Sequence, residues 1–211
     1  MTIAGMKNFK EIWTTILNVL IPFLLFIIVP LIVKGNFKRL IRKVRENLLE
    51  LRKYIPGDVY MAENELSSFK GKYGNHGINI SFVRKKNEQK VNMRITMKIS
   101  SQLPVKIYAK RLMQQKEGIK TGVSEIDERF TATSSSPERA KSLILSISRD
   151  DLTALKDFLR EGIVIGGEKI TLLKRNAGAK DTQPQELLSV LEVTGRIAQT
   201  IERLSPLTVS L

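Results

Sequence analysis

An uncharged run of 22 residues, Ile12–Val33, constrains this chain more than any other feature. As a helix rising about 1.5 Å per residue, it would reach roughly 33 Å and cross a hydrocarbon core of about 30 Å. Trp13 lies at one edge, where aromatic side chains favour the membrane interface. Pro22 and Pro30 interrupt the run, but membrane-spanning helices tolerate proline. The run therefore predicts one transmembrane helix in a first segment, residues 1–33.

A cleaved signal peptide is the main alternative explanation of this run. Its apolar region would span only about 7–15 residues and end at a small-residue cleavage site. Here the run is longer and stops at Val33-Lys34 without such a site. An uncleaved anchor therefore fits better, and a buried core helix would not need this length.

Basic residues beside the run set the expected orientation. Lys7 and Lys10 precede it, whereas eight basic residues lie between positions 34 and 53. Basic flanks are retained on the cytoplasmic side of a membrane during insertion. We therefore expect a single-pass protein of the cell (inner) membrane, with a short N-terminus outside and a cytoplasmic C-terminal domain.

The next segment, residues 34–55, combines an apolar stripe with a basic surface. Apolar residues recur at spacings of three and four, which predicts one face of a helix; they are Phe37, Leu40, Ile41, Val44, Leu48 and Leu51. The residues expected to contact anionic lipid are Lys34, Lys38, Arg39, Arg42, Lys43 and Arg45. Each basic residue near such a surface contributes about 1 kcal/mol. Alternatively, the stripe packs on the following domain and the basic residues are only solvated; both can hold.

The charge of the chain is concentrated near this segment. The net charge is +14, and residues 34–121 contain 21 basic and 7 acidic residues. Such an excess predicts an anionic partner, either a membrane surface or nucleic acid. The chain has no cysteine, so disulfides and thiolate sites are excluded. Because the excess lies beside the predicted anchor, a surface close to the membrane is favoured.

Residues 56–205 are expected to fold as a cytosolic α+β domain, followed by a loose tail, 206–211. Three segments alternate apolar and polar residues, "GINISF", "KVNMRITMKI" and "VKIYAK", which predicts successive strands of an antiparallel meander. One face would be core and the other exposed. The exposed face, a possible surface for a partner or nucleic acid, would display Lys90, Arg94, Lys98, Lys106, Tyr108 and Lys110. Sheets that recognise RNA need two or three exposed aromatic residues, and Tyr108 is the one clear candidate.

About three helices should pack on this antiparallel sheet. Ser136 with Pro137 predicts one helix start, and Ser148 with Asp151 predicts a second. Gly166-Gly167 predicts a hairpin turn between two apolar runs. A final helix should begin at Pro184.

Residues suited to catalysis are scarce. His76 is the only histidine, it lies in an expected loop, and no G-x-S-x-G motif accompanies it. Zinc would need three or four His or Cys ligands. Glu125, Asp127 and Glu128 could hold a hard cation, but ion pairing with Arg129 is the simpler expectation. We therefore predict no enzyme activity, no catalytic residue, no cofactor and no metal.

One segment, "TGVSEIDERFTATSSSPERAKSLI", resembles a pattern in prokaryotic membrane-anchored proteins whose cytosolic α+β domain has no assigned activity. In the pattern, a glycine leads to an acid-x-Phe core, a Ser- or Asp-rich turn and a helix. The matching residues are Gly122, Asp127, Arg129, Phe130, Ser136 and Ala140. With its flanks the resemblance covers about residues 65–204. It implies an α+β module behind one or two transmembrane helices, and it carries over no functional residue.

These patterns predict a non-catalytic scaffold or accessory subunit. Its cytosolic domain would contact another membrane protein or complex, or a second copy of the chain, at the anionic inner leaflet. The alternative is a membrane-tethered nucleic-acid-binding protein that uses the basic sheet face.

Overall fold

The computed structural model describes residues 3–61, 65–84, 90–100, 104–109 and 118–204. Within residues 3–33 it describes the side chains of residues 17, 18, 20–24, 26, 28, 29 and 32. The chain forms two compact units, Met1–Arg42 and Lys43–Leu211. The second unit contains the sheet and all helices except the first part of α1.

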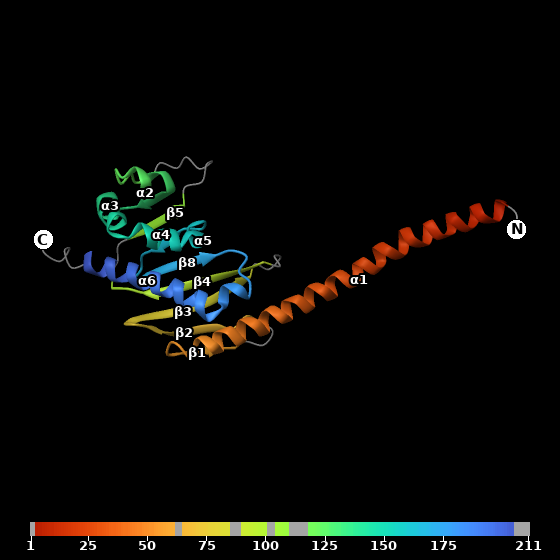
Figure 1. The fold of residues 1–211 in the computed structure, drawn as a ribbon, viewed down its shortest axis with the longest axis horizontal. Helices are drawn as coiled ribbons and strands as arrows, with labels where there is room; N and C mark the ends of the chain where they lie inside the picture. The colour runs from red at the N-terminus through yellow and green to blue at the C-terminus, as the bar shows by residue number, and fades with distance from the viewer. Residues whose placement is uncertain (1–2, 62–64, 85–89, 101–103, 110–117, 205–211) are drawn as a thin grey trace. The chain divides into compact units, whose positions relative to one another are not determined.

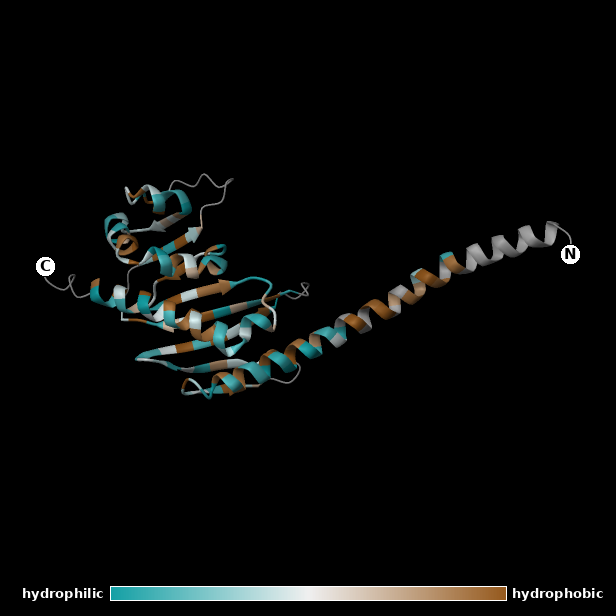
Figure 2. Cartoon of the chain, viewed as in Figure 1, coloured by the Kyte–Doolittle hydropathy of each residue, from teal (hydrophilic) through white to brown (hydrophobic). Residues whose placement is uncertain are grey.

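A continuous helix, α1 (Ile3–Leu51), covers both the predicted span and the predicted basic helix. In the first unit its described apolar side chains are exposed, for example Phe23 at 63%, Phe26 at 80% and Ile32 at 56%. Figure 2 colours much of this part of the helix brown, for hydrophobic residues. Among the side chains that the structure describes, no helix is long and apolar enough to cross a membrane. The transmembrane helix stays a prediction.

The second unit is built on an eight-stranded antiparallel sheet with the strand order β1-β2-β3-β4-β8-β7-β5-β6. The strands are β1 (Gly57–Tyr60), β2 (Ser68–Tyr73), β3 (His76–Arg84), β4 (Val91–Lys98), β5 (Val105–Ala109), β6 (Phe130–Ser134), β7 (Ile163–Ile165) and β8 (Lys169–Lys174). The predicted α+β class with an antiparallel sheet is therefore confirmed.

Alternating side chains give the sheet two unlike faces. On β4, Val91, Met93, Ile95 and Met97 are at most 3% exposed, while the residues between them are half-buried or exposed. Burial alternates in the same way on β3 and β8, and Figure 2 shows these changes of hydropathy along the strands. One face is therefore the core, as the period of two predicts.

Helices pack on the core face. They are α2 (Ser124–Arg129), α3 (Pro137–Ser146), α4 (Arg149–Ala154), α5 (Lys156–Leu159), the 3-10 helix η1 (Lys180–Thr182) and α6 (Pro184–Leu204). Figure 1 shows α6 running across the strands; it buries Leu187, Leu191 and Ile197. The end of α1 also belongs to this unit, where Leu48 is fully buried and the Asn47 amide donates to Ala179 O at 2.9 Å.

Most of the expected starts and turns are confirmed. Pro137 occupies the first turn of α3, and the Ser148 hydroxyl accepts a hydrogen bond from Asp150 N at 3.2 Å. The hairpin between β7 and β8 turns at Gly166-Gly167. Ser136 occupies the N-cap position of α3 as expected, but its side chain makes no capping hydrogen bond, and its N–H donates to Ser134 Oγ.

The predicted meander is wrong in its last step. β3 and β4 are neighbours, but β5 pairs with β6 and β7, and β8 pairs with β4. The β7–β8 hairpin therefore lies between β4 and β5. Periodicity identifies the face of each strand, whereas long-range pairing decides its neighbours.

Candidate anion-binding surface

The sheet face opposite the core, here called the open face, carries mainly basic and hydroxyl side chains; one acid, Asp58, stands opposite Lys70 on it. Six basic residues lie on it, here called the open-face cations: Lys70, Lys72, Arg94, Lys98, Lys106 and Lys169. Ser81, Thr96, Thr131 and Thr171 lie among them by strand register. Arg, Lys, Ser and Thr are among the side chains that contact phosphates in proteins that bind DNA.

The structure brings together only part of the predicted basic face. Arg94 and Lys98 on β4 and Lys106 and Tyr108 on β5 lie on the open face. Lys90 is exposed just before β4. Lys110 lies outside the described residues.

Sequence reasoning missed three open-face cations. Lys169 comes from the hairpin that inserts between β4 and β5, and Lys70 and Lys72 come from β2. The alternation in "KITLLK" and "SFKGKY" is the signal that could have placed them.

Several basic residues outside this set are paired with carboxylates. Lys174 Nζ lies 2.7 Å from Asp181 and 3.0 Å from Asp157, and Arg196 lies 2.6 Å from Asp151. Arg175 pairs with Glu161 at 2.7 Å, Arg196 also with Glu192 at 2.8 Å, and Arg149 with Glu125. Each carboxylate thus neutralises a nearby guanidinium or ammonium group.

These pairs also shift proton affinities. Burial alone lowers the pKa of Lys174, but hydrogen bonds and attraction from Asp181 and Asp157 outweigh it and raise the pKa. The hydrogen bond with Asp151 raises the pKa of Arg196. Both groups are therefore held in the charged form by specific acids.

The open-face cations differ from them. Among the described residues, no carboxylate lies within 4.0 Å of any of the six. Lys98 and Lys169 even stand directly opposite each other on β4 and β8, an arrangement in which like charges destabilise a sheet. An anion bound beside them would relieve this repulsion.

On the open face, a lysine ammonium group lies over the ring of each tyrosine. Lys106 Nζ lies 4.7 Å from the centroid of the Tyr108 ring, and Lys70 Nζ lies 5.0 Å from that of Tyr60. A cation over an aromatic face is attracted by the ring. Because recognition of single-stranded nucleic acid by stacking needs uncovered rings, the open face offers charge and hydroxyl groups rather than a stacking platform.

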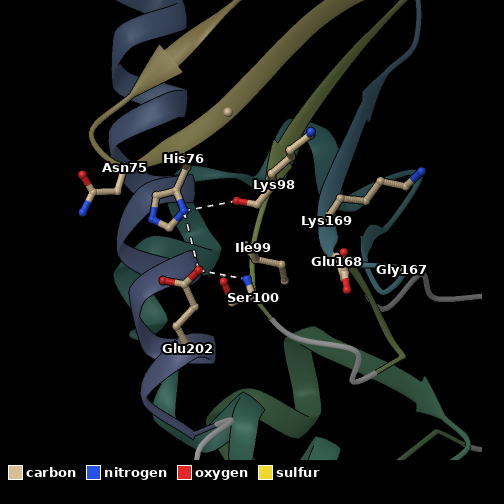
Figure 3. Close-up of a pocket in the computed structure, with 10 residues that line it drawn as sticks. Asn75, His76, Lys98, Ile99, Ser100, Gly167, Glu168, Lys169 and Glu202 are labelled. Atoms are coloured by element: carbon tan, nitrogen blue, oxygen red, sulfur yellow. Dashed lines mark hydrogen bonds and ion pairs between the residues drawn. The ribbon is translucent and has the colours of Figure 1, made fainter.

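A second site, beside His76, lies at one end of the sheet (Figure 3). His76 Nδ1 lies 3.1 Å from the Lys98 carbonyl oxygen, to which it donates, and 3.7 Å from Glu202 Oε1. Glu202 Oε1 also accepts a hydrogen bond from Ser100 N at 3.0 Å. These contacts tie the end of α6 to β3 and β4.

The His76 site does not assemble a catalytic pair. His76 starts β3 and is buried, so its expected place in a loop is wrong. Within the described residues, no serine hydroxyl is hydrogen-bonded to its ring. A cavity of about 530 Å³ adjoins it, but the side chains of Lys98 and Lys169 in its lining point away from His76 and Glu202 (Figure 3).

The acidic cluster before β6 organises a loop. Asp127 accepts hydrogen bonds from Thr121 N, Thr121 Oγ1 and Gly122 N at 2.8, 2.8 and 3.0 Å. Glu125 pairs with Arg149, so the expected pairing of this residue with Arg129 is wrong. Nowhere in the described residues do three His, Asp or Glu side chains lie close enough to hold a metal.

Comparisons with protein-family models, with curated proteins and with solved structures found no match. The resemblance to prokaryotic membrane-anchored proteins therefore stays an expectation.

Proposed function

We propose that this protein is a non-catalytic, single-pass membrane-anchored scaffold or accessory subunit. Its open face would bind an acidic surface of another membrane protein or complex at the inner leaflet. The observation that carries this proposal is the clustering of six basic side chains on one sheet face, none of which has a carboxylate within 4.0 Å among the described residues.

The first part of α1 supports the anchor. Nearly all of its described side chains between positions 17 and 32 are apolar, and they are exposed on every side of the helix. A helix that is apolar all round is suited to an apolar solvent. Exposed lysines and arginines follow at once, from Lys34 to Arg45, where anionic lipid would attract them.

Charge complementarity supports a protein partner for the open face. Charged surfaces steer association and discriminate between partners. The exposed basic rows of β2, β4 and β8 would meet rows of acidic side chains, and the hydroxyls between them would supply hydrogen bonds. The lysine-covered tyrosines favour this partner over a nucleic acid that is recognised by stacking.

A nucleic acid is the second candidate ligand. The mixture of hydroxyl and basic groups on β4, β8 and β6 favours it, because such groups make most phosphate contacts. This tethered nucleic-acid binder would recognise the backbone and bind without strong sequence preference.

Purification from the native membrane tests the proposal. The tagged full-length chain is extracted in mild detergent, with and without nuclease, and its partners are identified by mass spectrometry. The open-face variant carries Lys72→Glu, Lys98→Glu and Lys169→Glu. The matched control carries the same change of charge at exposed positions elsewhere: Arg139→Glu, Lys156→Glu and Lys180→Glu.

The wild type and the control should retain a stoichiometric membrane protein after nuclease treatment, and the open-face variant should lose it. Recovery of the partner by the open-face variant would contradict the proposal. Partners that disappear with nuclease would establish the nucleic-acid alternative instead.

A further inference from the structure

A cavity of about 300 Å³ opens in the middle of the open face. Strand register explains its position: Thr96 on β4 stands opposite Thr171 on β8, and Val164 on β7 stands opposite both Thr171 and Lys106. The cavity therefore spans four neighbouring strands. Its volume is at the low end of the range of ligand pockets, about 300–1,000 Å³.

Three cations line this cavity: Arg94, Lys106 and Lys169. In the described part of the chain, none of them has a carboxylate within 4.0 Å. Glu161 also lines the cavity, but its carboxylate lies 2.7 Å from the guanidinium of Arg175, and its side chain is only 12% exposed. The cavity thus keeps an excess of positive charge.

A glycine holds the rim of the cavity close to the strands. Gly162 has a φ of +92°, a left-handed conformation that favours glycine. A Cβ atom there would lie 2.8 Å from the Tyr108 ring and 3.0 Å from Lys106 Cε. The turn before β7 can therefore approach β5 this closely only without a side chain, which fixes the depth of the cavity beside Lys106.

We infer that this cavity binds a phosphate monoester group. A carboxylate carries a single charge, whereas a phosphate monoester carries about −1.5 to −2 at neutral pH together with three strong acceptor oxygens. Arg94 can bind two of these oxygens, Lys106 and Lys169 supply point charges, and the hydroxyl of Thr171 can donate to a remaining lone pair. The Thr96 hydroxyl donates to Asn79 O at 3.3 Å and would have to exchange this hydrogen bond for one to the phosphate. The inference rests on the proposed role of the open face as a binding surface and names the chemical group that it recognises.

Two sources could present this group, a soluble phosphomonoester or a lipid headgroup in the membrane. Isothermal titration of the full-length protein in detergent with glycerol 3-phosphate and with dihexanoyl phosphatidic acid distinguishes them. Tighter binding of the lipid by about tenfold or more would identify the lipid as the source; equal or tighter binding of glycerol 3-phosphate would identify the soluble compound. Dihexanoyl phosphatidylglycerol, a phosphodiester, is the comparison ligand and should bind at least about tenfold more weakly.

Substitutions test whether the phosphate monoester binds in this cavity. Arg94→Gln and Lys106→Gln should each weaken binding by about tenfold or more, because each removes a charged donor. Lys70→Gln removes a cation of the same face outside the cavity and should change affinity by less than about twofold. The thermal unfolding midpoint of each variant verifies that it folds.

The inference is overturned if neither monoester binds, if Arg94→Gln leaves the affinity unchanged, or if the phosphodiester binds equally well. A result that contradicts this inference is distinguishable from one that contradicts the proposed function. Titration needs no partner protein, and purification from membranes could still recover a partner that the open-face variant loses.

Discussion

The two faces of the sheet use positive charge differently. On the helix side, Lys174 and Arg196 each contact two carboxylates. On the open face, Lys98 and Lys169 stand opposite each other, and no described carboxylate lies within 4.0 Å of either. The first arrangement stabilises the fold, whereas the second destabilises the sheet and leaves charge available for a ligand. The difference separates structural basic residues from candidate binding residues.

The largest expected effect is a difference in the free energy of unfolding between two substitutions at neighbouring positions of β4, one on each face of the sheet. Ile95 is fully buried on the core face, so Ile95→Ala should lower the free energy of unfolding by about 2–5 kcal/mol. Thr96 points to the open face and donates one hydrogen bond, to Asn79 O at 3.3 Å, so Thr96→Ala should lower it by only about 0.5–1.5 kcal/mol. Urea denaturation of the full-length protein in detergent measures both, and equal losses would contradict the assignment of the faces.

A smaller effect is expected at the helix-side ion pairs. Asp151 is buried and accepts hydrogen bonds from Arg196 Nε at 3.0 Å and Nη2 at 2.6 Å. Asp151→Asn keeps the shape but removes the charge, so the protein should lose stability, by less than Ile95→Ala does. The same denaturation measures the loss, and a variant as stable as the wild type would show that this pair contributes nothing.

On the open face, a substitution is expected to increase the free energy of unfolding rather than lower it. Lys169→Glu turns the repelling pair with Lys98 into an attractive one and should raise the free energy of unfolding by about 0.2–1 kcal/mol. The same change should weaken phosphate binding in titration. A variant that is less stable than the wild type, or that binds the phosphate monoester with wild-type affinity, would contradict the proposed difference between the two faces.

The smallest expected effect is a pH dependence at Lys174. Folding raises the pKa of Lys174 above 10.5. The stabilisation is therefore fully present below that value and is lost as the pH rises through the pKa of the folded protein. Denaturation between neutral pH and pH values above 10.5 should show a steeper loss for the wild type than for Lys174→Met. Parallel curves would mean that Asp157 and Asp181 do not stabilise the charged lysine.

Strand period alone predicted which side chains face away from the core. Arg94 and Lys98 could be placed on one face because alternate residues of a strand point to opposite sides. Their neighbours could not be predicted, because β4 pairs with β8, a strand about 75 residues further along the chain. Lys169 was therefore missed, although it stands opposite Lys98.

Local signals were reliable where the local backbone decides the structure, as at Pro137 and Gly166-Gly167. They failed where tertiary contacts decide, as at His76. Its loop-like sequence "YGNHGIN" gives no sign that the Lys98 carbonyl and Glu202 would bury the ring. The same limit applies to Glu125, whose partner Arg149 lies in another helix.

Site-specific photo-crosslinking in cells tests most directly whether the open face is the binding surface. A photoreactive phenylalanine replaces either Val164, exposed on the open face, or Ser189, exposed on α6. Neither replacement changes the charge of the chain. Crosslinks to a partner polypeptide from position 164 and not from position 189 are predicted, and Lys98→Glu with Lys169→Glu should abolish them. Crosslinks from position 189 alone would contradict the account.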